Sequence, residues 1–172
     1  MPPPDRPHTG ARRIADVALR SPAPRRARVH WPAPCAEPAV AALVVLFSSG
    51  DDLADDLADD LADDPADEVV ARVGAVVLTV SATHTVEAHA AASWAADHAA
   101  ELGADAARIA LVGHGTGAAL AERVAELAVD EGWPPLRHVA LIWPHDDPAA
   151  ALDGLARALA APHPHRPTRS AR

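Results

Sequence analysis

Four short, continuous apolar segments separated by helical patterns are the feature that most constrains the fold of this chain. They read VAALVVLF, AVVLTVSA, ARIALVG and HVALIWP, over residues 40–47, 75–82, 107–113 and 138–144. Short apolar runs bounded by turn residues are typical of strands buried on both faces, as in a parallel sheet. Their alternation with helical segments predicts an α/β fold with helices on both faces of the sheet.

The segments between these strands carry helix signals. Asp64 and Pro65 fit the N-cap and the first position of a helix over 65–73. Gly103 and Gly132 fit the ends of two further helices. The remaining helices are expected over residues 86–103, 116–132 and 147–160, and two opening strands over residues 14–22 and 26–32.

These elements predict one α/β domain over residues 14–160, between two proline-rich ends. Residues 1–13 and 161–172 are expected to be disordered, because proline forbids regular helix and few residues there are apolar. Residues 51–64 form an insertion that repeats the sequence DDLA. We interpret it as a solvated charge run, since it lacks the glycine and the spaced ligands of a calcium loop.

Charge and cysteine content exclude several classes of protein. The net charge is −9, but residues 51–68 hold ten of the 24 acidic residues, and the rest of the chain is nearly neutral. Nucleic-acid binding is therefore not expected. The single cysteine, Cys35, fits a reducing compartment. Without a secretory signal or an apolar run of about 20 residues, we expect a cytoplasmic protein that does not enter the membrane.

A glycine-rich turn, LVGHGTGAAL over residues 111–120, joins a predicted strand to a predicted helix. Gly113 and Gly117 frame His114, Gly115 and Thr116. Two kinds of chemistry use such a turn. One is the nucleophile elbow, G-x-S-x-G, whose flanking glycines let strand and helix pack closely. The other is the dinucleotide fingerprint, G-x-G-x-x-G/A.

The dinucleotide fingerprint is matched by Gly113, Gly115 and Ala118. It calls for an acidic residue about 20 positions later, at the end of the next strand. Asp130 lies at a helix end instead, and Asp146 comes late. A nucleotide or small-molecule site across the Gly113–Ala118 turn therefore stays an alternative.

The longer segment ELGADAARIALVGHGTGAALAERVAELAVDEGWPPLRHVALIWP, residues 101–144, resembles the elbow region of hormone-sensitive-lipase-like esterases of the α/β-hydrolase fold. That family has an LGAD-x-x-RI lead-in, an elbow of the form G-H-S-x-G and a next strand ending like LIYP. Upstream, ALVVLFSSGDD resembles the strand before the family's H-G-G-G oxyanion loop. The resemblance covers roughly residues 14–145 and implies a partial α/β-hydrolase sheet of carboxylesterase or lipase ancestry.

The chain departs from this family at the residues that carry the chemistry. Gly115 stands at the nucleophile position. The resemblance places the oxyanion donors at Ser49, Gly50 and Thr116. Asp51 directly follows Gly50, and a carboxylate there opposes a developing oxyanion. The family's catalytic acid and histidine follow the nucleophile on later strands, which are missing here. We therefore expect no catalytic residue, no metal and no cofactor in a C-terminally truncated relative.

Substitute catalytic groups are few. Thr116 and His114 flank the apex rather than occupy it. Asp146 or Asp147 with a tail histidine has the chain order of a triad, but the aspartates come too early in the chain. Nothing in the proline-broken tail positions its two histidines, which are His163 and His165. Three further histidines are isolated and are interpreted as surface or packing residues, namely His84, His89 and His98.

Three functions follow from these observations. The first is an inactive, pseudoenzyme-like relative of esterases, and its implied ligand is an acyl-ester-like small molecule. The others are the nucleotide or small-molecule binder and an active esterase with relocated catalytic residues. Because later strands are missing, we expect the strand over 138–144 or a neighbour to be an exposed edge. Self-association or a protein partner would cover that edge.

Overall fold

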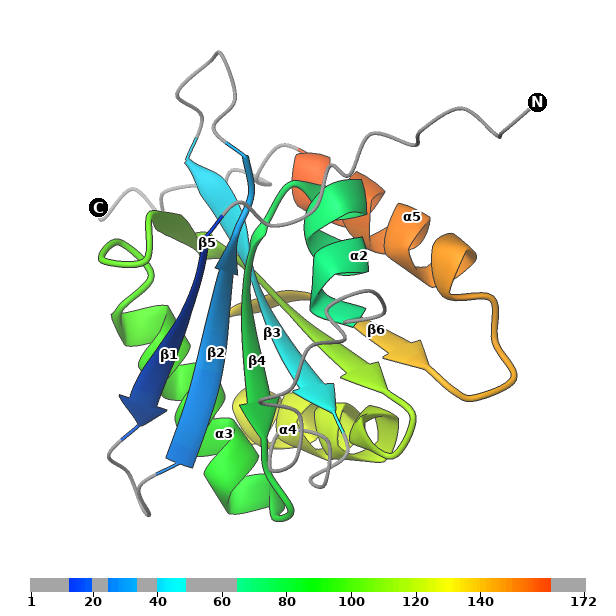
Figure 1. Ribbon diagram of the computed structural model, residues 1–172. Helices are drawn as coiled ribbons and strands as arrows, with labels where there is room; N and C mark the ends of the chain where they lie inside the picture. The colour runs from blue at the N-terminus through cyan, green and yellow to red at the C-terminus, as the bar shows by residue number, and fades with distance from the viewer. Residues whose placement is uncertain (1–12, 20–24, 34–39, 49–64, 162–172) are drawn as a thin grey trace, which may run out of the picture.

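The computed structural model describes residues 13–19, 25–33, 40–48 and 65–161, which form a six-stranded sheet between two pairs of helices (Figure 1). The strands are β1 (Arg13–Leu19), β2 (Arg25–Trp31), β3 (Ala41–Ser48), β4 (Val76–Ser81), β5 (Ala104–His114) and β6 (Leu136–Ile142). The helices are α2 (Pro65–Val73), α3 (Thr85–Asp97), α4 (Gly117–Glu131) and α5 (Pro148–Ala160). The expected acidic insertion, Ser49, Gly50 and the C-terminal tail lie outside the described residues.

The strand order across the sheet is β1-β2-β4-β3-β5-β6. β4, β3, β5 and β6 run parallel, whereas β2 pairs antiparallel with both β1 and β4. This confirms the predicted α/β fold with parallel core strands. It also places β6 at one edge of the described sheet.

Strand β3 shows why its sequence is a continuous apolar run. Alternate residues of a strand point to opposite faces of the sheet. Leu43, Val45 and Phe47 pack in the cluster that includes α3 and α4, while Val44 and Leu46 pack in the cluster that includes α2 and α5. All five are fully buried. Helices cover both faces of the sheet (Figure 1), so the run over 43–47 is apolar at every position.

The connections of the parallel strands create one special point in the sheet. From β3 the chain passes through α2 to β4 on one side, and it then returns through α3 to β5 on the other side of β3. In open α/β sheets, ligands bind at the carboxyl ends of strands where the winding reverses in this way. The carboxyl ends of β3 and β5 are therefore the expected position of a site.

Most predicted helix boundaries are confirmed, but the expected end of α3 at Gly103 is wrong. The helix ends at Asp97, and turns follow over 98–103. The carbonyl oxygen of Trp94 accepts hydrogen bonds from both the backbone N–H and the ring Nδ1 of His98, at 3.0 and 2.8 Å. After His98 the backbone pairing shortens, because the Ala99 N–H donates to the Ala96 carbonyl oxygen three residues back, at 3.5 Å, and the α-helix ends there. Gly103, at φ +77°, belongs to the turn that leads into β5.

The predicted bounds of the last strand are shifted by two residues. β6 covers Leu136–Ile142 rather than 138–144. The backbone N–H of Trp143 donates to the carboxylate of Asp146 at 3.0 Å, and the Asp146 N–H donates back to the Trp143 carbonyl oxygen at 2.9 Å. These two bonds form a turn directly after the strand, so Trp143 cannot continue the ladder.

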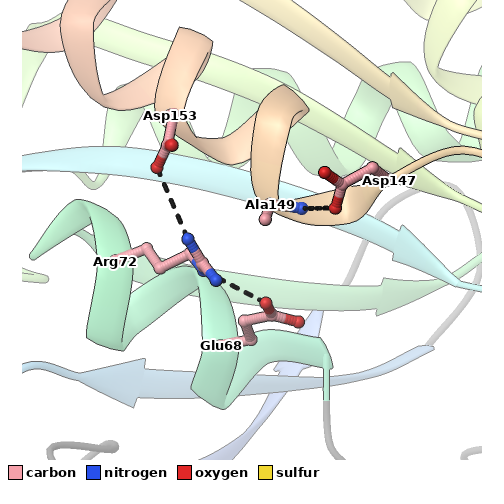
Figure 2. Close-up of polar contacts among 5 residues, drawn as sticks. All are labelled: Glu68, Arg72, Asp147, Ala149 and Asp153. Atoms are coloured by element: carbon pink, nitrogen blue, oxygen red, sulfur yellow. Dashed lines mark hydrogen bonds and ion pairs between the residues drawn. The ribbon is translucent and has the colours of Figure 1, made fainter.

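Helix α5 is fixed to the sheet by arginine side chains. The Arg108 guanidinium donates to the carbonyl oxygens of Leu159, at 2.8 Å, and Val40, at 3.2 Å. Cations near the last carbonyls of a helix also interact favourably with its dipole. On the same face, Arg72 of α2 bridges Glu68 and Asp153 of α5 (Figure 2). That network is exposed, so it contributes little to stability.

No helix in the described part of the chain is both long and apolar enough to cross a membrane.

Candidate functional site at the turn after β5

The glycine-rich turn lies at the reversal point of the sheet. Gly113 at the end of β5 is in register with Phe47 of β3. The backbone N–H of Gly115 donates to the carbonyl oxygen of Ile142 at the end of β6, at 2.9 Å. The Gly115 carbonyl oxygen accepts from the Ala118 N–H in the first turn of α4, at 3.1 Å. Backbone bonds thus connect the apex of the turn to β6 and α4.

The two flanking glycines allow three backbones to pack without side chains between them. A Cβ on Gly113 would lie 2.8 Å from the backbone nitrogen of Ala118. A Cβ on Gly117 would overlap the carbonyl oxygen of Phe47 and lie 2.6 Å from its carbonyl carbon. Real Cβ atoms do not approach so closely. The strand, the helix and the neighbouring strand β3 therefore require glycine at both positions, as expected for an elbow.

Gly115, at the apex of the turn, has a left-handed backbone and no side chain. Its φ is +59°, which lies in the left-handed region where L side chains are strained. A Cβ built on Gly115 would meet no atom within 4 Å. The apex therefore has room for a side chain, and glycine occupies it without strain.

Thr116 and His114, the neighbours of the apex, are both exposed. Thr116 is the residue before the first turn of α4, and its hydroxyl makes no capping bond there. A substitute nucleophile needs a base within hydrogen-bond reach. Within the described ranges, neither the Thr116 hydroxyl nor the His114 ring has a hydrogen-bond partner. This arrangement does not activate either group.

The two aspartates after β6 have local roles. Asp147 is the N-cap of α5, and its carboxylate accepts from the Ala149 N–H at 3.0 Å (Figure 2). The Asp146 carboxylate closes the turn at Trp143. Among the residues with described positions, no histidine is hydrogen-bonded to either carboxylate. His163 and His165, their expected triad partners, lie outside the described residues.

Buried and half-buried histidines fill structural positions away from the turn. The ring of His89 is within 2.8 Å of the carbonyl oxygen of Trp133, which connects α3 to the segment after α4. The ring of His98 stacks on Trp94, with 4.4 Å between ring centroids. Burial lowers the pKa of His138 in β6 below 6.5, so this ring favours its neutral form. His84 precedes α3 and makes no capping bond.

Sequence reasoning located the turn but missed two roles that the structure assigns. An aspartate before a proline at the start of a helix is an N-cap signal, so the role of Asp147 could have been found from the pair Asp147–Pro148. The role of Arg108 could not, because its acceptors, Leu159 and Val40, lie 51 and 68 residues away in the chain.

Comparison with known proteins identifies relatives of this chain. A family model described as alpha/beta hydrolase fold matches residues 55–166. Esterase LipI of Mycobacterium tuberculosis is 31% identical over 140 residues, which are 77% of this chain and 44% of LipI.

Solved structures of esterases also superpose on this chain. The hyperthermophilic esterase from Pyrobaculum calidifontis superposes with a TM-score of 0.60 at 24% identity, over 75% of this chain and 44% of that protein. EstE1, a thermophilic carboxylesterase cloned from a metagenomic library, superposes with a TM-score of 0.59 at 24% identity, over 76% of this chain and 46% of that protein. The chain thus spans less than half the length of these relatives.

Proposed function

This chain belongs to the α/β-hydrolase fold family, and we propose that it is a catalytically inactive relative of the esterases in that family. One observation carries the proposal. The apex of the turn at the carboxyl ends of β3 and β5 is Gly115, at φ +59°, with open space where a nucleophile would project. A backbone in this conformation has the geometry of the elbow but offers no atom that can attack an ester carbonyl.

The residues around the apex support the same proposal. In this fold, the acid and the histidine follow the nucleophile in chain order. After β6, the described chain supplies only α5, and the carboxylates of Asp146 and Asp147 accept bonds from backbone N–H groups. Hydrolysis of an ester needs a positioned base and donors for the oxyanion, in addition to a nucleophile.

The turn keeps a role in the fold, and an acyl-ester-like small molecule is the ligand that its ancestry favours. The lack of a Cβ at Gly113 and Gly117 lets β5, α4 and β3 pack closely together. The dinucleotide alternative has less support, because its pattern needs an acidic residue at the end of the next strand that is available to a ligand. Asp146 follows β6, but its carboxylate accepts from the Trp143 N–H and closes a local turn.

Restoring the missing side chain alone is expected not to restore activity. The variant Gly115→Ser should fold, because the space at the apex is open, at a cost of about 1–2 kcal/mol for a left-handed residue. Its serine would lack a positioned base, so it should not react with a fluorophosphonate probe. Intact-mass spectrometry after incubation with the probe should show both wild type and variant unmodified.

An active esterase from the same family, labelled in the same buffer, is the positive control for the probe. An adduct on Gly115→Ser but not on wild type would mean that this chain still supplies a base. In that case only the nucleophile would have been lost, and the base would have been kept. An adduct on the wild-type protein would contradict the proposal itself.

A further inference from the structure

An apolar groove with an acidic border lies between α4 and β6, at the edge of the described sheet. It has a volume of about 670 Å³. Its apolar lining comes from two residues of α4 and two of β6. The lining residues are Ala125, Val129, Val139 and Leu141, with Glu122, Glu126 and Asp130.

The apolar part of this groove is open to solvent. Val129, which lies near the C-terminal end of α4, has 80% of its surface exposed. Val139 and Leu141 are only half-buried, and they belong to β6, which has no further strand beside it in the described sheet. Apolar residues gathered at an open edge of a sheet are typical of an interaction surface.

The charges around the groove have one sign. Glu122, Glu126 and Asp130 follow one another at every fourth position of α4, and all three are exposed. None of the described residues that line the groove is basic. Arg137 of β6 does not line the groove, and its guanidinium donates to the carbonyl oxygen of Ala158 in α5 at 3.0 Å. Among the described lining residues, the carboxylates therefore have no cation beside them.

This charge distribution indicates which kind of partner the groove can bind. If a second copy paired with β6 about a two-fold axis, its α4 would lie on the same face of the joined sheet and bring three more carboxylates to the groove. Like charges brought together in this way oppose association. We propose that the groove binds an amphipathic helix of another protein, whose apolar side is flanked by arginine or lysine.

The dimensions of the groove suit such a helix. The lining part of α4 extends from Glu122 to Asp130, a rise of about 12 Å or a little over two turns. A partner helix laid along α4 would place its apolar positions, spaced three and four residues apart, on Val129, Val139 and Leu141. Its flanking cations would face the acidic border. This is the helix-in-groove mode of recognition.

The test uses a synthetic peptide as the probe. The peptide is a helix of about four turns with leucine at positions i, i+3, i+4 and i+7 and arginine on both flanks; a matched peptide carries glutamate in place of arginine. Fluorescence anisotropy should show saturable binding of the arginine peptide only. Binding should weaken at least tenfold for Glu126→Arg and for Val129→Asp. It should also weaken with added salt, which screens exposed charges.

Matched variants elsewhere on the surface serve as controls. Glu101→Arg makes the same charge change at an exposed residue outside the groove, and Val86→Asp makes the same apolar-to-acidic change at a valine that is 66% exposed on α3. Both should bind the arginine peptide within twofold of wild type. Circular dichroism should show that all four variants remain folded, since each replaces an exposed side chain.

Three outcomes would overturn the proposal. One is equal binding of the two peptides or equal effects of groove and control variants. Another is no binding of the arginine peptide at any concentration up to its solubility limit. The third is a wild-type dimer in sedimentation that Val129→Asp dissociates, which would make a second copy of this chain the occupant.

Discussion

Replacing Gly117 with alanine is expected to destabilise the domain by about 3 kcal/mol or more. The added Cβ would overlap the carbonyl oxygen of Phe47 and lie 2.6 Å from its carbonyl carbon. Both atoms belong to the backbone of β3, a central strand that is buried on both faces. No flexible side chain can move aside, so α4 must shift away from the sheet. Urea denaturation followed by circular dichroism measures the loss.

Gly115→Ala is the matched control for this substitution. It adds the same methyl group two residues earlier, where no atom lies within 4 Å. Its cost comes only from the left-handed backbone, about 1–2 kcal/mol. If Gly117→Ala lowered the free energy of unfolding no more than Gly115→Ala does, α4 would not pack closely on β3 at this position. Gly117 would then lack the packing role of an elbow glycine.

The variant Phe47→Ala is expected to lower the free energy of unfolding by about 3–5 kcal/mol. Phe47 is the largest of the fully buried side chains, and it lies at the end of β3 beside the turn. The helix residues that share its cluster are small, and most are alanine, including Ala88, Ala91, Ala92, Ala95 and Ala121. Alanine has no side-chain freedom with which to fill a gap, so the cavity would persist.

Phe47→Leu separates the cavity from other effects at this position. Leucine keeps most of the apolar volume, so its cost should stay at or below about 1.5 kcal/mol. Denaturation midpoints of the two variants, compared with wild type, give the difference. Similar losses for leucine and alanine would indicate that the shape of the aromatic ring, rather than the filled volume, stabilises this corner of the sheet.

The elements of this fold are predictable from sequence because their signals are local. The apolar runs become β3, β4, β5 and β6, and Pro65 and Gly132 mark the start of α2 and the end of α4 as expected. The packing role of Gly113 and Gly117 follows from their spacing, since a strand and a helix that meet at a tight turn leave no room for a Cβ.

Features that depend on distant partners were not predictable. The hydrogen bonds of Arg108 join it to the carbonyl oxygens of Leu159 and Val40, which lie 51 and 68 residues away in the chain. The position of β4 between β2 and β3 follows from pairing in three dimensions, which no local pattern records. The acidic groove arises only when α4 and β6 are brought together.

One part of the candidate site can likewise be predicted from the sequence, and another part cannot. The identity of the apex, Gly115, is explicit in the sequence, and the structure adds its left-handed backbone and the open space beside it. The local roles of Asp146 and Asp147 emerge only from their hydrogen bonds to backbone N–H groups. Those bonds are the reason that we do not assign either carboxylate to a relocated triad.

Steady-state hydrolysis of p-nitrophenyl acetate by the wild-type protein, beside Gly115→Trp, tests the loss of catalysis most directly. Tryptophan at the apex would fill the space where an ester would bind. We expect both proteins to hydrolyse the ester at the same slow rate, without saturation by substrate. Saturable hydrolysis by the wild type at an enzyme-like rate, abolished by Gly115→Trp, would contradict it and establish an esterase whose catalytic residues have been relocated.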